Sequence, residues 1–439
     1  MMNTDTVIPS NNTADAASIA PAVASAKSVR RGGGRGIYSA IVVRALRRLR
    51  RGRLELTLPS GETIAIGDSA AEERAEIRIT HDQFFEKCVL YGDIGFGEAF
   101  VDGDWETDDI AAVIRWLILN VENAPGMSGS RAGRGLVNLL AAANRLMHLM
   151  RPNSRKKSRD NIREHYDLSN GLYELFLDDS MTYSSGLFRA RESLEEAQAA
   201  KYRRLCEQLQ LKAGDHVLEI GCGWGGFCCF AAHHYGCRVT AVTISKAQLD
   251  YATRRVEREG LTDLITVELQ DYRDLVGKFD KIVSIEMLEA VGDAYVDGYF
   301  EQCSKLLKPD GLLALQMITC PDGRYDSFRK GVDWIQKHIF PGSLLMSVGR
   351  VNQAVNRTGQ FFLHDLKDMG ASYARTLRHW RARFNARLDR VRELGFDDAF
   401  IRKWNYYLSY CEAAFDMRNI SVTQVVFTRP NNLSLSERG

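Results

Sequence analysis

A short apolar run that ends in a glycine-rich turn constrains the fold more than any other stretch of this chain. Residues 217–226 read VLEIGCGWGG, and residues 227–235 continue with apolar side chains at helical spacing. Glycines let the backbone adopt positive φ angles and approach a ligand closely. The pattern therefore predicts the first strand, turn and helix of an α/β nucleotide-binding unit. Some turns of this kind bind NAD or FAD, and others bind nothing.

The end of the second expected strand argues against a dinucleotide ligand. Residues 238–244 form this strand, and a dinucleotide site would require Asp or Glu near its end to bind the ribose hydroxyls. The residues found there are Thr243, Ser245 and Gln248. The sequence therefore weakens the nicotinamide interpretation.

The third and fourth expected strands favour a different nucleoside ligand. The third, at 265–269, is followed by Gln270, Asp271 and Tyr272, and the fourth occupies 279–285. The Asp271 carboxylate can accept a hydrogen bond from an adenine amino group, and Tyr272 can pack on the ring. Taken with the glycine turn, these strand ends resemble those of an S-adenosylmethionine-dependent methyltransferase.

This resemblance implies roles for several residues and a fold for the whole chain. Glu219 and the turn containing Gly221 and Gly223 would hold the methionine part of S-adenosylmethionine, and residues 243–248 would hold its ribose. The expected fold class is α/β, with a Rossmann-like class I methyltransferase domain and a small α+β amino-terminal domain. At 439 residues, the chain is long enough for two or three domains.

The positive charges are unevenly distributed. Residues 1–60 contain ten Lys or Arg against three Asp or Glu, and a second basic cluster occupies 151–159, although the net charge is only +2. Such asymmetry indicates a polyanionic partner, either nucleic acid or an anionic membrane surface. Solvated basic linkers are the simpler alternative.

The spacing of the cysteines and the lengths of the apolar runs indicate the cellular compartment and the kind of membrane contact. The nine cysteines form no Cys-x-x-Cys pair, so we expect no disulfide framework, no metal site and a reducing cytoplasm. No run approaches the roughly 18 apolar residues that a membrane span requires, and the start lacks a secretion pattern. Any membrane contact is therefore expected to be peripheral.

The chain divides into five expected segments. Residues 1–36 are too polar to bury a core and are predicted to be a disordered tail. An amino-terminal domain follows at 37–150, then a basic linker at 151–163, a methyltransferase domain at 164–430 and a tail at 431–439.

Within the amino-terminal domain, the pattern predicts a basic amphipathic helix, a hairpin and two later helices. The first helix, 37–51, places Ile41, Val42, Ala45, Leu46 and Leu49 on one side, so it suits either an anionic leaflet or docking on its own domain. The hairpin spans 54–66. The later helices are expected near 108–121 and 134–150.

The methyltransferase domain has further expected elements around the first four strands. A helix at 193–210 leads into the first strand. After the fourth strand come a helix near 295–307, a turn at 308–311, a fifth strand at 312–318 and a final strand at 422–427. The carboxyl-terminal aromatics are expected to be partly core, and a subset could line an acyl tunnel; they are Trp380, Phe384, Trp404, Tyr406, Tyr407 and Phe415.

Several ordered motifs between about residues 54 and 430 resemble the cyclopropane-fatty-acyl-phospholipid synthase family, whose mycobacterial relatives modify mycolic acids. The motifs share their order and spacing with the family; they are the 97–105 segment GEAFVDGDW, the 165–168 segment HYDL, Tyr183 with Ser184, the glycine turn, the 243–248 and 270–272 segments, and the 338–342 segment HIFPG. The resemblance adds Tyr166, Tyr183 and Ser184 to the expected cofactor-binding residues.

The resemblance also implies a reaction. In the family, the sulfonium methyl group is transferred to a cis double bond of a phospholipid acyl chain, and the resulting carbocation is stabilised and deprotonated. A bound bicarbonate acts as the base, held by Cys, Glu, His, Tyr and a backbone group at Ile. Carried to this sequence, the Glu is Glu289, the backbone group belongs to Ile318 and the Tyr is Tyr373.

This chain departs from the family pattern where the remaining groups would stand. The family Cys is replaced by Ser185, the His after the Glu is Ala290, and the bicarbonate-binding His is Gln316. Ser and Gln can still donate hydrogen bonds, so a bicarbonate site in altered form is compatible with the sequence. A titratable imidazole is lost from both positions.

These departures leave three functions open. The first is formation of a cyclopropane fatty acid. The second is C-methylation that gives a methyl- or methylene-branched chain, and the third is N- or O-methylation of a small molecule; a non-enzymatic lipid-binding relative is a fourth hypothesis. The expected partners are unsaturated phospholipid acyl chains and the anionic inner face of the cell membrane, contacted peripherally from the cytoplasm. Nucleic acid is not expected, and a homo-oligomer is left open.

Overall fold

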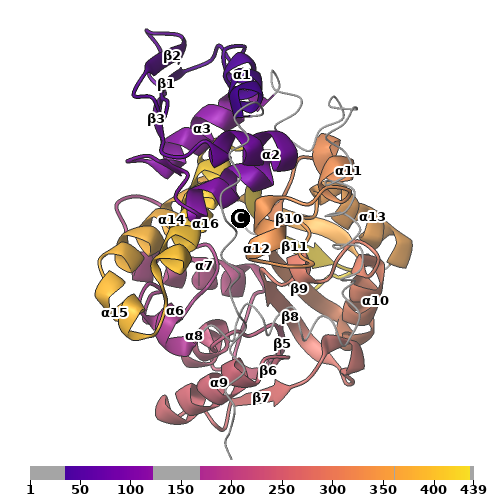
Figure 1. The fold of residues 1–439 in the computed structure, drawn as a ribbon. Helices are drawn as coiled ribbons and strands as arrows, with labels where there is room; N and C mark the ends of the chain where they lie inside the picture. Colours follow the sequence, from indigo (N-terminus) through magenta and orange to yellow (C-terminus); the bar gives the residue numbers. More distant parts are fainter. Residues whose placement is uncertain (1–34, 122–168, 360, 436–439) are drawn as a thin grey trace, which may run out of the picture.

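The computed structural model describes residues 35–121, 169–359 and 361–435. An amino-terminal domain lies above a larger sheet domain, and the helices α14 (Gly370–Asn385) and α16 (Asp398–Asp416) lie where the two meet (Figure 1). The predicted linker 151–163 and the predicted helix 134–150 fall outside the described residues, as does the predicted tail apart from residues 35 and 36, which begin the first helix.

The amino-terminal domain contains a four-stranded sheet in the order β2-β1-β3-β4. Strand β1 pairs with β2 in antiparallel register, Leu54 opposite Ile66, which confirms the predicted hairpin. Leu54 and Leu56 are buried and alternate with more exposed residues, so one face of the sheet contributes to the core. The elements of this domain are α1 (Arg35–Leu46), β1 (Arg53–Thr57), β2 (Thr63–Gly67), β3 (Arg74–Ile79), α2 (Gln83–Val101), β4 (Trp105–Glu106) and α3 (Ile110–Leu119).

Helix α1 is shorter than expected and its apolar residues do not form one buried stripe. It ends at Leu46 instead of near Arg51, and the chain later turns at Gly52, where φ is +69°, into β1. Leu46 and Leu49 are buried, whereas Ile41 is 48% exposed. The apolar residues of α1 are therefore only partly docked on the domain, and Ile41 faces away from the core.

The larger domain is built on a seven-stranded sheet in the order β10-β11-β9-β8-β5-β6-β7. The five strands from β9 to β7 are mutually parallel, and β11 lies antiparallel between β9 and β10. This order confirms the expected Rossmann-like class I methyltransferase fold. The strands are β5 (His216–Ile220), β6 (Arg238–Thr243), β7 (Ile265–Leu269), β8 (Phe279–Ile285), β9 (Leu307–Thr319), β10 (Phe362–Asp368) and β11 (Ser421–Thr428).

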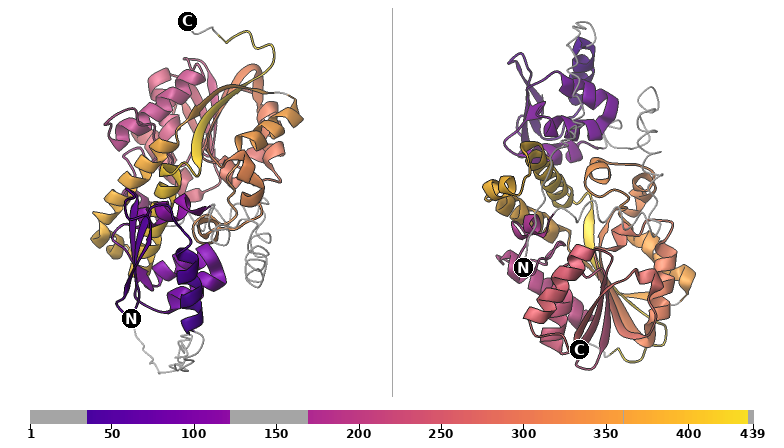
Figure 2. Two further views of the ribbon diagram at one scale, coloured as in Figure 1. Left: turned by 90° about the horizontal axis from the view of Figure 1, so that it is seen from above. Right: turned by 60° about the horizontal axis from the view of Figure 1, so that its bottom comes forward.

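Helices cover both faces of this sheet (Figure 2, right). Successive residues of a strand point to opposite faces, so Val217 packs in the core under α7, α8 and α9, whereas Leu218 packs in the core under α10 and α13. The helices of the domain are α6 (Asn170–Glu174), α7 (Leu194–Gln208), α8 (Gly226–Tyr235), α9 (Lys246–Arg258), α10 (Val296–Leu306), α11 (Tyr325–Phe328), α12 (Trp334–His338), α13 (Val348–Thr358), α14, α15 (Leu388–Glu393) and α16, with short 3₁₀ turns η2 (Tyr272–Asp274), η3 (Leu288–Ala290) and η4 (Asp322–Arg324).

Two details differ from the sequence-based expectations. Strand β10 was not predicted because its residues, FLHDLKD, lie at the sheet edge and are mostly exposed, so they carry no apolar run. The expected turn at 308–311 is instead part of the long strand β9.

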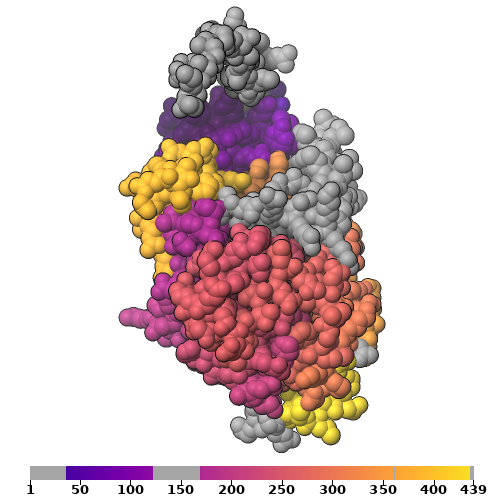
Figure 3. Space-filling model, turned by 90° about the horizontal axis from the view of Figure 1, so that it is seen from below, coloured from indigo at the N-terminus to yellow at the C-terminus, as the bar shows by residue number. Residues whose placement is uncertain are grey.

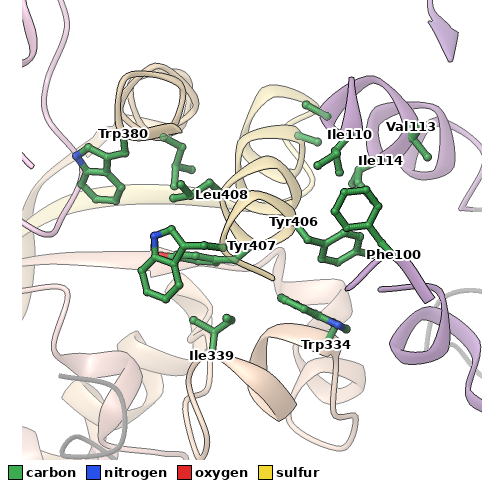
Figure 4. Close-up of a cluster of buried hydrophobic side chains, with 14 of the residues drawn as sticks. Phe100, Ile110, Val113, Ile114, Trp334, Ile339, Trp380, Tyr406, Tyr407 and Leu408 are labelled. Atoms are coloured by element: carbon green, nitrogen blue, oxygen red, sulfur yellow. The ribbon is translucent and has the colours of Figure 1, made fainter. Parts of the chain in front are cut away.

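The two domains share one buried core. Helix α16 lies between α14 and the amino-terminal helices, and Phe100, Ile110, Trp334 and Tyr406 converge around it (Figure 4). The ring centroids of Trp334 and Tyr406 are 4.6 Å apart, and those of Phe100 and Tyr406 are 5.7 Å apart. The amino-terminal domain is thus packed against the helices that adjoin the sheet domain. Seen from below, the sheet domain forms the front of the molecule and the amino-terminal domain lies beyond it (Figure 3).

Candidate active site

The glycine turn connects β5 to α8 as predicted. Gly221, Gly223 and Gly225 all have positive φ, between +54° and +84°, which L-residues with a Cβ adopt only with strain. The Gly221 amide donates to the carbonyl oxygen of Val242 at 2.9 Å. A Cβ on Gly221 would lie 2.9 Å from Cγ of Met287. The backbone therefore passes close to the segment after β8, and Gly221 and Gly223 line a cavity in which a ligand can bind.

Glu219 provides a buried carboxylate next to this turn. The residue is 2% exposed and lines the same cavity as Gly221. Its Oε2 atom has no hydrogen-bond partner among the described residues, and burial raises the pKa of this carboxyl well above its usual value. A cationic ligand group would supply the missing partner, so the position fits the ammonium group of S-adenosylmethionine.

The 243–248 segment is a helix cap whose side chains bind one another. The Thr243 hydroxyl donates to Gln248 Oε1 at 2.8 Å, and Ser245 Oγ accepts from the Gln248 amide at 3.3 Å. Thr243 and Gln248 line the cavity, whereas Ser245 caps α9 and is not among the lining residues. The predicted ribose contacts from Thr243 and Gln248 are therefore geometrically accessible, and Ser245 orders the turn.

The segment after β7 also reaches the cavity. Asp271 is buried, and both its carboxylate oxygens accept from the Arg273 guanidinium, at 2.8 and 2.6 Å. An adenine amino group that donated to Asp271 would therefore use a carboxylate oxygen that already accepts a hydrogen bond from Arg273. Tyr272 and Gln270 line the same wall, and the Gln270 side chain donates to the carbonyl oxygen of Asp274 at 3.1 Å.

A cavity of about 340 Å³ connects the residues predicted to bind the cofactor to a largely apolar chamber. Its walls come from α14, α16 and the segment around α12, as well as from the ends of the parallel strands. Tyr407 and Phe415 line it, whereas Trp380, Phe384, Trp404 and Tyr406 do not and belong to the core. The apolar and aromatic lining residues include Trp224, Ile335, Phe340, Leu345, Leu377, Tyr407, Tyr410, Phe415 and Ile420.

The loop that contains Tyr183 and Ser184 borders both the polar and the apolar part of the cavity. Tyr183 lines it, and its hydroxyl lies 2.8 Å from the hydroxyl of Tyr407. Ser184 also lines it, and its Oγ accepts from the ammonium of Lys201 at 2.7 Å. Tyr166, predicted with these residues as a cofactor contact, lies outside the described residues.

A buried carboxylate that the sequence reading missed lies at the centre of the site. Glu286 Oε1 accepts from the Ser185 amide at 2.9 Å and from Gln316 Nε2 at 2.8 Å, and Oε2 accepts from the Tyr373 hydroxyl at 2.8 Å. Burial raises the pKa of Glu286, while these donors and the charge of Lys201 oppose that rise. One signal was available in the sequence, because Glu286 directly follows the fourth strand, where carboxyl ends of parallel strands gather ligand-binding groups.

Glu289 follows three residues later, in the 3₁₀ turn η3, and lines the same cavity. Its Oε1 accepts from the backbone amide of Ile318, and Oε2 has no hydrogen-bond partner among the described residues. Burial, together with the charge of Glu286, raises the pKa of Glu289 to about 8. Glu289 therefore binds its proton more strongly than an ordinary carboxyl, whereas the donors around Glu286 and the charge of Lys201 favour the charged form of Glu286.

The five predicted catalytic residues fall into two groups. Glu289, Tyr373 and the Ile318 position line the cavity. Ser185 and Gln316 are buried behind Glu286 and are not among the lining residues; the Ser185 hydroxyl donates to the carbonyl oxygen of Gly186 at 2.9 Å. These two residues hold Glu286 in place, so their predicted direct role at a bound anion remains a prediction that this geometry does not favour.

Comparison with known proteins points to one family. Residues 153–425 match the family model described as mycolic acid cyclopropane synthetase. The tuberculostearic acid methyltransferase UfaA1 of Mycobacterium tuberculosis is 36% identical over 430 residues, covering 93% of this chain and 95% of its own length. The cyclopropane-fatty-acyl-phospholipid synthase of Escherichia coli is 37% identical over 377 residues, covering 86% of this chain and 93% of its own length.

A solved structure supports the same grouping. The crystal structure of mycolic acid cyclopropane synthase CmaA1 in complex with SAH and CTAB superposes with a TM-score of 0.57 at 29% identity. The superposition covers 62% of this chain and 98% of CmaA1.

Proposed function

The chain belongs to the mycolic acid cyclopropane synthetase family and is an S-adenosylmethionine-dependent methyltransferase, and on this basis we propose that it methylates the double bond of an unsaturated fatty acyl chain of a membrane phospholipid. The first candidate product is a cyclopropane fatty acid. The relatives that cover most of the chain carry names of fatty-acid or acyl-phospholipid enzymes, which favours an acyl substrate over a small amine or phenol.

One observation carries this proposal. The glycine turn and the Glu286–Glu289 pair open into the same cavity, whose remaining walls are largely apolar and aromatic. An alkyl chain gains free energy by burial in such a cavity, at about 25 cal/mol per Å² of apolar surface. A polar small molecule would gain less there and would leave the apolar walls uncovered.

The residues that line the cavity would hold the cofactor and keep water away from the reacting carbons. S-adenosylmethionine, when bound, supplies an electrophilic methyl group. Glu219 and the backbone at Gly221 would hold its amino-acid part, and the 270–273 segment its base. The rings of Tyr407 and Phe415 could face a positive charge on the acyl chain, at about 0.5–2 kcal/mol per ring, and the apolar walls would keep water from it.

A second candidate product is a methyl- or methylene-branched acyl chain. Gln316 and Ser185 replace the titratable groups that the family pattern places there, and both side chains are turned toward buried partners. The relative with the widest coverage of this chain among those described above is a tuberculostearic acid methyltransferase. Both products begin with the same methyl transfer and differ in how the cation loses its proton.

The amino-terminal domain is proposed to engage the lipid surface. Ile37 and Ile41 on α1 are 61% and 48% exposed, and Arg44, Arg47 and Arg48 are exposed beside them. Apolar side chains with neighbouring cations suit the surface of an anionic leaflet, where each Lys or Arg contributes about 1 kcal/mol. Among the described residues, no helix has the length and apolar character needed to cross a membrane. We therefore propose peripheral binding at the inner face of the cell membrane.

Fatty-acid mass spectrometry tests the proposed function. Cells that make unsaturated phospholipids would express the chain or its Gly221→Ala variant, and their acyl chains would be derivatised to separate rings from branches. We expect acyl chains that gain one carbon, as rings or as branches, in the wild type only. An unchanged lipid profile, with turnover of soluble amines or phenols by the purified protein, would contradict the proposal.

A further inference from the structure

The bicarbonate site that the family resemblance implies does not fit this chain. Three of the five positions expected to hold the anion are already engaged by Glu286, since the Ser185 amide, the Gln316 side chain and the Tyr373 hydroxyl all donate to its carboxylate. The fourth donor, the Ile318 amide, is taken by Glu289. A second anion would therefore have to displace a carboxylate of the chain and lie beside the charge of Glu286.

The surrounding hydrogen bonds hold Glu286 in a single arrangement. Gln424 Nε2 donates to Gln316 Oε1 at 2.9 Å, which turns the Gln316 amide nitrogen toward Glu286. The Gln316 carbonyl oxygen accepts from the Glu286 amide at 2.7 Å. Tyr373, whose hydroxyl binds Oε2, is itself fixed by stacking on Phe415 with ring centroids 4.4 Å apart. The carboxylate is thus preorganised on both oxygens.

The backbone at Glu286 is also unusual. Its φ angle is +48°, and this left-handed region is strained for a residue with a Cβ. Such strained residues persist where the surroundings hold them and cluster at functional sites. Glycine would adopt this backbone without strain, so a Glu286→Gly substitution removes the carboxylate while leaving the local path of the chain intact.

The groups around Glu286 suit a proton acceptor. Glu286 lines the cavity, its carboxylate accepts hydrogen bonds from Tyr373 on α14 and Gln316 on β9, and the charge of Lys201 on α7 acts on it. From these elements and from η3, the charged or titratable groups that act on it are Lys201, Tyr373 and Glu289. Burial lowers the pKa of Lys201 to about 7, and burial raises that of Glu286. A carboxylate with a raised pKa binds a proton more strongly than one in water.

We propose that the carboxylate of Glu286 takes the place of bicarbonate and accepts the proton that the methylated acyl chain releases. This inference rests on the proposed function. The double-bond electrons form the new C–C bond to the methyl carbon, and the electrons of the broken C–S bond remain on sulfur, which becomes neutral. The neighbouring carbon then carries the positive charge. The chain loses a proton to Glu286, and the electrons of the broken C–H bond close a ring or, after a hydride shift, form a methylene double bond.

The first test is the dependence of the wild-type protein on bicarbonate. Formation of S-adenosylhomocysteine would be measured with unsaturated phospholipid vesicles in buffer depleted of carbon dioxide, and again with bicarbonate added. We expect equal rates in both buffers. A rate that falls to background on depletion and returns with bicarbonate would overturn the inference, and this test requires no variant to fold.

The second test compares two substitutions at the same residue. Glu286→Gln should lower the rate by about 100-fold or more, the range for loss of a general base, and added bicarbonate should not restore it because the amide still fills the position. Glu286→Gly should be equally slow without bicarbonate and should regain activity when it is added. Glu257→Gln, an exposed change on α9, is the control. A Glu286→Gln protein that binds S-adenosylmethionine and retains the wild-type rate would overturn the inference.

A binding measurement separates this inference from the proposed function. Carbon-13 NMR with labelled bicarbonate should detect no bound anion in the wild type and a bound anion in Glu286→Gly. If the wild type methylates no phospholipid, the proposed function fails, yet this measurement still reports whether Glu286 occupies the anion position. Bicarbonate bound to the wild-type protein would show that it does not.

Discussion

Glu98 on α2 of the amino-terminal domain contacts His338 on α12 of the sheet domain, with 2.9 Å between Glu98 Oε1 and His338 Nε2. The ammonium of Lys337 donates to the same oxygen at 2.7 Å. The neighbouring residues Ile335 and Phe340 line the active-site cavity. One carboxylate of the amino-terminal domain thus positions a segment that forms a wall of the site.

The first prediction concerns this contact. Glu98→Gln should raise the KM for phospholipid vesicles several-fold, because the cavity-lining residues between 335 and 343 lose the ion pair that holds them. The affinity for S-adenosylmethionine should be unchanged, because the glycine turn is not altered. The loss in stability should be about 1 kcal/mol or less, since partly exposed ion pairs contribute little. Steady-state kinetics and calorimetry measure the two effects.

A matched control for this prediction is Glu76→Gln. Glu76 lies on β3 of the same domain and pairs with the partly exposed Arg78, and neither residue lines the cavity. It should leave both constants unchanged. If Glu98→Gln weakened cofactor binding and spared the KM for lipid, the assigned role of the contact would be wrong.

The second prediction concerns the glycine turn. Gly221→Ala should abolish measurable binding of S-adenosylmethionine, because the new methyl group would lie 2.9 Å from Met287 in a backbone conformation with φ of +84°. Gly214→Ala is the control, since Gly214 also has positive φ, +92°, but its Cβ would meet nothing within 4 Å. Both changes should destabilise the protein by roughly 1–2 kcal/mol through backbone strain. Only Gly221→Ala should remove cofactor binding. If Gly214→Ala also removed it, backbone strain would be the cause and the close contact with Met287 would not.

The third prediction tests the packing between the domains. Gly97→Ala places a methyl group 2.6 Å from Trp334 Nε1 and 2.8 Å from Tyr406 Cε1, so it should destabilise the protein by about 1–3 kcal/mol through overpacking. Gly298→Ala is the matched helical control, because its Cβ would have no neighbour within 4 Å. That change should be stabilising by roughly 0.5–1 kcal/mol because alanine favours the helix. Urea unfolding of the two variants measures whether the free energy of unfolding decreases for Gly97→Ala and increases for Gly298→Ala.

Much of the fold could be predicted because its signals are local. Alternation around Pro59–Gly61 predicted the β1–β2 hairpin, and the apolar run before Gly221 predicted β5 and the turn after it. Strand β10 gave no such signal, because an exposed edge strand buries little apolar surface on either face. Its place in the sheet depends on pairing with β11, which is a long-range property.

The site was harder to predict than the fold because side chains can change partners without changing their positions in the sequence. The resemblance placed Gln316 and Ser185 at a bound anion, whereas in the structure the Gln316 side chain and the Ser185 amide donate to the carboxylate of Glu286. Nothing in the spacing of these residues shows which way a buried amide turns. Its orientation is set by Gln424 on β11, more than a hundred residues away in the sequence.

The last prediction concerns pH. The carboxyl group of Glu289 has a pKa of about 8 in the folded protein, against an ordinary value of 4.5 in the unfolded chain. Between these two pH values the folded protein keeps a proton that the unfolded chain has lost, so the free energy of unfolding decreases as the pH rises from about 4.5 to about 8. Below that window, both states are protonated and this contribution is fully present.

Glu289→Gln should flatten this part of the stability profile, because the amide cannot ionise and can still accept the hydrogen bond from the Ile318 amide. Urea unfolding of both proteins across the window isolates the contribution, since the other titrating groups are common to both. Wild type and variant should be most alike at the acidic end, and the variant should become relatively more stable toward pH 8. Parallel profiles would mean that Glu289 ionises normally in the folded protein and would contradict its raised pKa.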